Sequence, residues 1–114
     1  MKRKNCCPIA QALGVLGDKW SLIVLRDVIF GIKRHFNDLL DSPEKISTNI
    51  LSNRFKTLQQ ESLLCCSVDL ENRRSKIYTP TEKAQDLVPV LVELYKWGEK
   101  YNDRADTAEN PLQE

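Results

Sequence analysis

The sequence of 114 residues predicts a mainly α-helical domain with one small β-hairpin. Three observations support this fold class. Apolar residues recur at helical spacing through most of the chain. Two short apolar segments, 63–70 and 76–79, flank the polar turn ENRRS, which is typical of a hairpin. The composition, with 41% hydrophobic and 29% charged residues, is that of a globular chain, and the length suits one domain.

The first two helices lie in the first 30 residues. One helix is expected to begin at Pro8, because proline suits the first helical position, where its missing N–H has no partner to lose. Gly17 ends this helix. A second helix is expected over residues 19–30, and it is apolar on almost every side, so we expect it at the centre of the core. Gly31 ends it, as glycine often does at helix C-termini.

The middle of the chain predicts two helices joined by a short turn. After an extended connector at residues 33–35, a short helix is expected over residues 36–40. Ser47 or Thr48 then caps a fourth helix that runs to about Ser62. The buried stripe of this fourth helix is expected to contain Leu51, Phe55, Leu58 and, in support, Ile50. Such a pair, with a polar outer face on its second helix, is the helix-turn-helix pattern.

A long final helix follows the hairpin. Thr81 is its expected N-cap, and its apolar pattern continues to about Asn102. Pro89 is expected to kink it. The complete order of elements predicts a winged helix-turn-helix over residues 1–102, followed by a polar tail at residues 103–114.

One face of the predicted fourth helix is rich in amides and hydroxyls. Exposed helix faces usually carry Glu, Lys and Arg, because Asn, Ser and Thr are poor helix formers. Asn can pair with adenine and Lys with guanine in the major groove, so this composition indicates contacts to DNA bases and phosphates rather than a merely hydrated face. The expected contact residues are Ser47, Thr48, Asn49, Ser52, Asn53 and Lys56. Arg54 lies partly toward the core, where a structural ion pair is at least as favoured as a phosphate contact.

The charge of the chain is unevenly distributed. The net charge is +1, yet residues 1–80 carry +5 and residues 81–114 carry −4. This asymmetry indicates a polyanion-binding face in the first part of the chain. Basic residues expected to contact the minor groove or the DNA backbone are Arg73, Arg74 and Lys76 on the hairpin, and Lys33 and Arg34 beside the helix-turn-helix. The alternative for each is a charged turn that stays hydrated.

The last helix has an apolar stripe that a core of this size cannot cover. A second copy of the chain can cover it, so we expect a homodimer that forms through the first and last helices. The expected interface residues are Ile9, Leu13, Leu91, Leu94, Tyr95 and Trp97.

Four segments resemble a known family in their order along the chain. CPIAQALGVLGDKWSLIVLRDV, HFNDLL, ISTNILSNRFKTLQQESLL and YTPTEKAQDLVPVLVELYKWG are similar to the HxlR family of winged-helix transcriptional regulators, within the MarR-like group. The resemblance covers residues 7 to about 98. It implies a dimeric regulator that binds double-stranded DNA, by default a repressor, with its wing at residues 72–76. The chain has Ser62 where the family often has glycine, and it departs from the family pattern again at residues 80–84.

Cys7 has two readings. It precedes Pro8 at an expected helix N-terminus, where the helix dipole favours a thiolate. Some members of the family that this chain resembles sense oxidants or electrophiles at this cysteine, which implies a redox role for Cys7 with Cys6, Cys65, Cys66 or a second subunit as partner. The other reading is a small buried apolar residue. The adjacent cysteine pairs lack the ligand spacing of a zinc site, so no metal is expected.

Other classes of protein receive less support. The chain has no Gly-rich phosphate loop and no Cys-x-x-Cys, and His35 lacks an obvious partner, so we expect neither an enzyme nor a cofactor. A winged-helix module that binds proteins, or a regulator with a small-molecule effector held by Trp20, Tyr95 and Trp97, remains the alternative. No apolar run reaches the roughly 18 residues of a membrane span, so the expected location is the cytoplasm.

Overall fold

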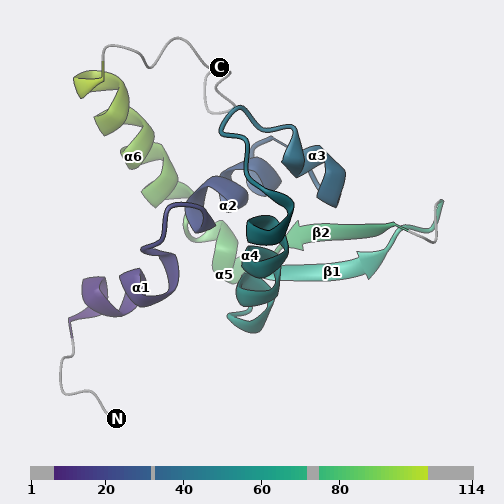
Figure 1. Cartoon of the computed structure of the whole chain (residues 1–114). Helices are drawn as coiled ribbons and strands as arrows, with labels where there is room; N and C mark the ends of the chain where they lie inside the picture. Colours follow the sequence, from purple (N-terminus) through teal and green to yellow (C-terminus); the bar gives the residue numbers. More distant parts are fainter. Residues whose placement is uncertain (1–6, 32, 72–74, 103–114) are drawn as a thin grey trace.

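The computed structural model describes residues 7–31, 33–71 and 75–102 (Figure 1). The elements are α1 (Pro8–Leu16), α2 (Ser21–Ile29), α3 (Phe36–Leu40), α4 (Thr48–Gln60), β1 (Leu64–Val68), β2 (Lys76–Pro80), α5 (Glu82–Gln85) and α6 (Val88–Tyr101). The mainly helical fold with one antiparallel hairpin is therefore confirmed. Within the described ranges, none of the helices has both the length and the apolar character that a membrane crossing needs.

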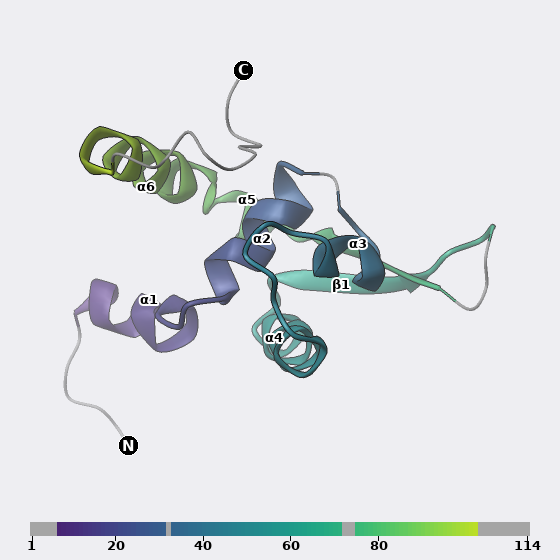
Figure 2. The same ribbon diagram turned by 45° about the horizontal axis from the view of Figure 1, so that its top comes forward.

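Helix α2 lies at the centre of the fold, as its apolar sequence predicted (Figure 2). Its core side chains pack with residues of α3, α4, β1 and α5, and the cluster includes Val24, Leu25, Val28, Leu39, Leu51, Phe55, Leu58, Leu64 and Ala84. Burial of each large side chain contributes about 1.5–3 kcal/mol. The predicted stripe of α4 is confirmed except at Ile50, whose exposed fraction is 37%. Ile50 lies one position outside the buried stripe, on the flank of the helix.

The hairpin is attached to the helical body along its second strand. Cys66 of β1 pairs with Tyr78 of β2, and Leu64 pairs with Pro80 in the antiparallel register. The backbone N–H of Tyr78 donates to the carbonyl oxygen of Arg34 at 2.8 Å. The connector between α2 and α3 therefore lies along the outer edge of β2 and satisfies a backbone group that the two-stranded hairpin leaves unpaired.

The final helix is divided in two, which corrects the prediction of one kinked helix. Thr81 caps α5 as expected, because its side chain accepts a hydrogen bond from the N–H of Ala84 at 3.1 Å. Helix α5 ends at Gln85, and α6 begins at Val88 with Pro89 in its first turn. Proline has no N–H to donate to the carbonyl four residues earlier and clashes with that carbonyl, so the chain breaks before Pro89 instead of bending at it.

The end of α4 is closed by contacts from the start of α5. Ser62 adopts a φ of 61°, the left-handed conformation in which helices often place glycine. The hydroxyl of Thr81 donates to the carbonyl oxygen of Ser62 at 2.7 Å, and Lys83 Nζ donates to the carbonyl oxygen of Glu61 at 2.7 Å. These bonds satisfy carbonyl groups that the helix itself leaves unpaired.

A polar network joins α2 to the turn between α3 and α4. The carboxylate of Asp27 is buried, and it accepts hydrogen bonds from Ser42 Oγ and from Arg26 Nε, the latter at 2.9 Å. Arg26 also donates twice to Glu44, at 2.8 and 2.9 Å. Burial lowers the pKa of Arg26. The hydrogen bonds to Glu44 and the charge of Asp27 raise this pKa by more than burial lowers it, so the net shift is upward. The hydrogen bonds from Arg26 lower the pKa of Glu44.

This network predicts a large loss of stability when Asp27 is changed to alanine. The Asp27→Ala variant removes the acceptor of the buried Ser42 hydroxyl and of Arg26 Nε, while Arg26 keeps its two bonds to Glu44, so the free energy of unfolding should fall by about 2 kcal/mol. Urea unfolding at one fixed protein concentration measures the change. The matched control is Asp41→Ala, since Asp41 is exposed in the same turn and should alter the free energy by less than about 0.5 kcal/mol. Equal losses in the two variants would contradict a specific role for Asp27.

Candidate nucleic-acid interface

The polar face of α4 is exposed along its whole length. Ser47 is the N-cap, and its Oγ accepts a hydrogen bond from the N–H of Ile50 at 3.2 Å, so its hydroxyl proton remains available to another acceptor. The other predicted contact residues, all exposed, are Thr48, Asn49, Ser52, Asn53 and Lys56. They lie opposite the buried stripe of the same helix. The structure thus brings the whole predicted set onto one surface.

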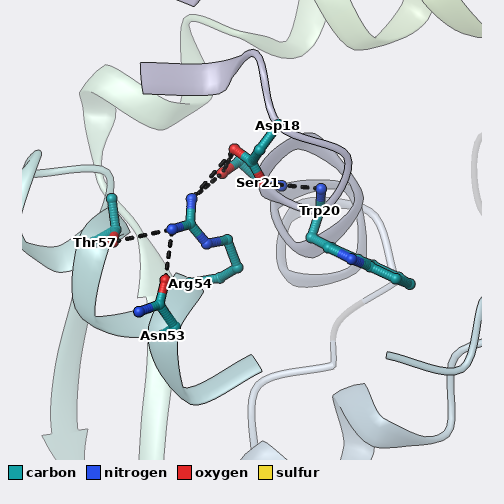
Figure 3. Close-up of polar contacts among 6 residues, drawn as sticks. All are labelled: Asp18, Trp20, Ser21, Asn53, Arg54 and Thr57. Carbon is teal, nitrogen blue, oxygen red and sulfur yellow. Dashed lines mark hydrogen bonds and ion pairs between the residues drawn. The ribbon is translucent and has the colours of Figure 1, made fainter. Parts of the chain in front are cut away.

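Arg54 connects this surface to α2 (Figure 3). Its NH1 lies 3.2 Å from Asp18 Oδ1 and 3.2 Å from Ser21 Oγ. Its NH2 lies 2.6 Å from Asn53 Oδ1 and 3.4 Å from Thr57 Oγ1. The guanidinium therefore contacts residues of both helices. The structural ion pair that the sequence allowed for Arg54 is the one observed.

Asp18 serves both as the cap of α2 and as the partner of Arg54. Its Oδ2 accepts hydrogen bonds from the N–H groups of Trp20 at 2.9 Å and Ser21 at 3.0 Å. Its Oδ1 accepts the hydroxyl of Ser21 at 2.5 Å. Burial raises the pKa of Asp18, but these hydrogen bonds and the charge of Arg54 outweigh it and lower the pKa. Asp18 is thus an ionised cap that also determines where Arg54 lies.

Aromatic contacts set the hairpin against α4. The rings of Phe55 and Tyr78 are stacked with centroids 3.9 Å apart, and Phe36 of α3 lies 5.9 Å from Phe55. Beside these rings an open groove is lined by Ser52, Lys56, Gln59, Gln60 and the aromatic side chains of Phe36, Phe55 and Tyr78. Gln59 and Gln60 extend the amide-rich surface toward the hairpin; the sequence placed Gln60, but not Gln59, on this polar face.

The basic residues of the hairpin and flank are only partly placed. Lys76 is exposed at the start of β2, as predicted, whereas Arg73 and Arg74 lie outside the described residues. Lys33 and Arg34 are half-buried rather than fully exposed. The Nε atom of Arg34 is buried without a hydrogen-bond partner among the described residues, and the charge of Lys33 contributes to the lowered pKa of Glu44. Packing of the connector against β2 thus turns part of this flank inward.

His35 has two acidic partners, which corrects the expectation that it had none. Nδ1 lies 3.3 Å from Asp38 Oδ2, and Nε2 lies 3.1 Å from Asp69 Oδ2. The hydrogen bond to Asp69 raises the pKa of His35, desolvation opposes it, and Asp38 adds to the rise, with a net upward direction. The His35 ring therefore joins the start of α3 to the chain that follows β1, where the turn of the hairpin begins.

The described thiols lie near the surface. Cys7 is exposed in the single protomer, at the N-cap of α1, and is not buried there as the alternative reading expects. On β1, Cys65 is exposed and Cys66 is half-buried. Cys6 lies outside the described residues.

Helices α1 and α6 extend from the same end of α2, on the side away from the hairpin tip (Figure 1; Figure 2). The exposed fraction is 70% for Ile9 and 67% for Trp97, and Leu13 and Leu94 are exposed as well. Tyr95 is half-buried. Leu91 differs from this expectation, because it is only 6% exposed and most of its side chain packs within its own protomer. Of the predicted aromatic pocket, Trp20 packs against the core while Trp97 pairs with Tyr101 on the surface.

Sequence reasoning missed the polar residues that hold α4 in place. Asp18, Ser21, Arg26, Asp27 and Glu44 were not singled out. One indication was present, because Arg26 and Asp27 interrupt an otherwise apolar helix, and a buried charge requires a partner. The identity of those partners, 15 and 18 positions away, could not be read from the sequence.

A helix-turn-helix pair followed by an antiparallel hairpin defines the winged helix-turn-helix class. The sequence model of the HxlR-like helix-turn-helix family matches residues 15–106. The chain therefore belongs to the HxlR-like helix-turn-helix family, as the resemblance implied. The proteins to which it is similar are transcriptional regulators and not enzymes.

Two relatives come from Bacillus subtilis strain 168. The helix-turn-helix transcriptional regulator YdeP is 33% identical over 103 residues, which cover 90% of this chain and 80% of YdeP. The regulator YodB is 29% identical over 107 residues, which cover 94% of this chain and 95% of YodB.

Solved structures show the same fold. PA1607, described as a candidate transcription factor, has a TM-score of 0.82 and 32% identity over 97% of this chain and 76% of its own. The redox regulator HypR in its oxidized form has a TM-score of 0.75 and 28% identity, with coverage of 85% and 99%. The quinone-bound form of YodB from B. subtilis has a TM-score of 0.67 and 26% identity, with coverage of 83% and 100%.

The contacts of His35 predict a pH-dependent stability. Because the pKa of His35 is raised above its ordinary value of 6.5, its contribution is complete below pH 6.5 and disappears as the pH rises through the folded-state pKa. The melting temperature of the wild type should therefore exceed that of His35→Gln at pH 6, and the difference should shrink by pH 9. The control Asn37→Ala changes an exposed neighbour on α3 and should show a difference independent of pH. A wild-type advantage that grows with pH would show that a neutral His35 makes the contact.

Proposed function

We propose that this protein is a transcriptional repressor of the cytoplasm that binds a near-palindromic operator in double-stranded DNA as a homodimer. The observation that carries the proposal is the exposed face of α4, where amides, hydroxyls and Lys56 lie on one rigid surface. Amide and amino donors on a helix match the donor and acceptor pattern of the major groove. Lys76, at the start of β2, is suited to contact the DNA backbone beside the major groove. For Arg73 and Arg74 we propose, from the sequence, contacts with the minor groove or the DNA backbone.

The homodimer is supported by the apolar surfaces of α1 and α6. Ile9, Leu13, Leu94 and Trp97 are exposed, and an apolar surface of this kind is typical of an interface. Both helices lie on the side of α2 away from the hairpin tip, so a pair formed there leaves both copies of α4 uncovered. A two-fold dimer then presents its two recognition helices to half-sites about one helical turn, or roughly 34 Å, apart.

A redox or electrophile response is supported by Cys7 and by the similar proteins. Cys7 is exposed at the N-terminus of α1, the helix that the proposed dimer buries in part. HypR is a redox regulator, and YodB has a quinone-bound form. We extend this to Cys7. An oxidant takes two electrons from the Cys7 thiolate and a second thiol, that of Cys6, Cys65, Cys66 or the other subunit, and a disulfide bond forms between them; alternatively, the thiolate adds to a quinone. Either product changes the position of α1 in the dimer and so the affinity for the operator.

Selection of duplexes from a random library by the reduced protein tests DNA recognition. One near-palindromic motif should be enriched, because two copies of α4 read equivalent half-sites. On the selected duplex, Lys56→Ala should weaken binding by roughly tenfold. It should also lower the slope of log Kd against the logarithm of salt concentration by about one. The matched control is Lys96→Ala, since Lys96 is exposed on α6 and should leave both quantities unchanged. Binding without an enriched motif would contradict sequence-specific recognition, and an enriched motif without symmetry would contradict the dimer.

The response at Cys7 has its own test. Diamide and benzoquinone should each reduce binding of the wild type to the selected duplex by about tenfold or more, and Cys7→Ser should bind as tightly as the reduced wild type before and after either treatment. Fluorescence anisotropy measures both affinities. Cys65→Ser, which removes an exposed thiol of the hairpin, is the control for benzoquinone and should respond to it like the wild type, because an adduct at Cys7 needs no second thiol. Release of DNA from Cys7→Ser by either reagent would assign the response to another thiol.

A further inference from the structure

Arg54 determines how the amide of Asn53 is oriented. A guanidinium group has five N–H donors and no acceptor, so the atom of Asn53 that faces it must be the carbonyl oxygen. Arg54 NH2 lies 2.6 Å from Asn53 Oδ1, and Figure 3 shows the nitrogen of the Asn53 amide pointing away from Arg54. The orientation of this amide, which often has to be assumed, is therefore decided by its neighbour.

Arg54 is itself held in place, so the orientation persists. Asp18 and Ser21 bind NH1 from the start of α2, and Thr57 adds a contact to NH2 from the next turn of α4. The side chain of Arg54 is 20% exposed. These contacts keep the guanidinium beside Asn53 instead of extended toward a DNA phosphate.

This arrangement changes what Asn53 can read. A paired contact with adenine needs the amide oxygen to accept from N6 and the amide nitrogen to donate to N7. In this protein the oxygen already accepts from a cation, and the positive charge behind it disfavours the amino group of adenine. Guanine presents two acceptors, O6 and N7, to the donors that remain.

We propose that Arg54 is a specificity-determining residue, which holds the oxygen of Asn53 so that Asn53 turns its N–H donors toward the base and selects guanine over adenine at its base pair. This inference rests on the proposed DNA-binding function. Asn49 serves as an internal comparison, because it is exposed one turn earlier on α4 and no hydrogen bond joins it to Arg54 within the described residues. The choice of base at the position of Asn49 is therefore independent of Arg54.

The test compares the selected motifs of the wild type, Asn53→Ala and Arg54→Met. The wild type should prefer guanine at one position of each half-site, and Asn53→Ala should lose that preference, which identifies the position. Arg54→Met frees the oxygen of Asn53, so adenine should gain at least about fivefold over guanine at that position alone. Binding constants for paired duplexes that differ only in this base give the ratio.

Arg54→Lys keeps the inference testable if Arg54→Met fails to fold, which circular dichroism detects. A lysine ammonium can hold Asp18 but cannot hold Asn53 at the same time, so the same shift should occur in smaller degree. Two results would overturn the role of Arg54 and leave the proposed function intact. In one, the base position identified by Asn53→Ala still prefers guanine in the Arg54 variants. In the other, the Arg54 variants lose affinity equally at all base positions. Failure of the wild type to enrich any motif overturns both.

Discussion

The buried carboxylate of Asp27 is the constraint on which the arrangement of the helix-turn-helix depends. A charge in this position requires donors, and the chain provides them from Arg26 beside it and from Ser42 in the turn after α3. Arg26 then requires Glu44, which lies two residues further along the turn. Satisfaction of one buried group thus fixes the turn against α2. Helix α4 begins at Thr48, shortly after Glu44, so the starting point of α4 is fixed as well.

A second polar attachment lies at the opposite end of α2. Asp18 caps the helix and holds Arg54 from the middle of α4. Between the two attachments, the contact of α2 with α4 is apolar and contains Leu25 and Leu51. Dispersion and apolar burial stabilise this contact but are not directional, whereas the hydrogen bonds at both ends set position and rotation. A recognition surface needs that precision, because a displacement of about 1 Å is enough to misplace its donors.

Much of the fold could be predicted from the sequence because local chemistry decides it. Pro8, Ser47 and Thr81 begin helices where their backbone and side-chain properties favour a helix start. The helical spacing of the apolar positions identified the buried stripe of α4 and therefore its exposed face. The break before Pro89 was misjudged, since a proline in a helical pattern is compatible with a kink or with a new helix.

The sequence by itself determined the helices, the hairpin, the identity of the amide-rich face and the apolar surfaces of α1 and α6. These follow from periodicity and from the preferences of single residues. Only the tertiary structure decided that Leu91 faces inward, that His35 lies between two carboxylates, and that Asn53 shares its oxygen with Arg54. The physical reason is that such contacts join residues far apart in the chain or depend on side-chain orientation. Their formation is decided when α2, α4 and β2 pack together.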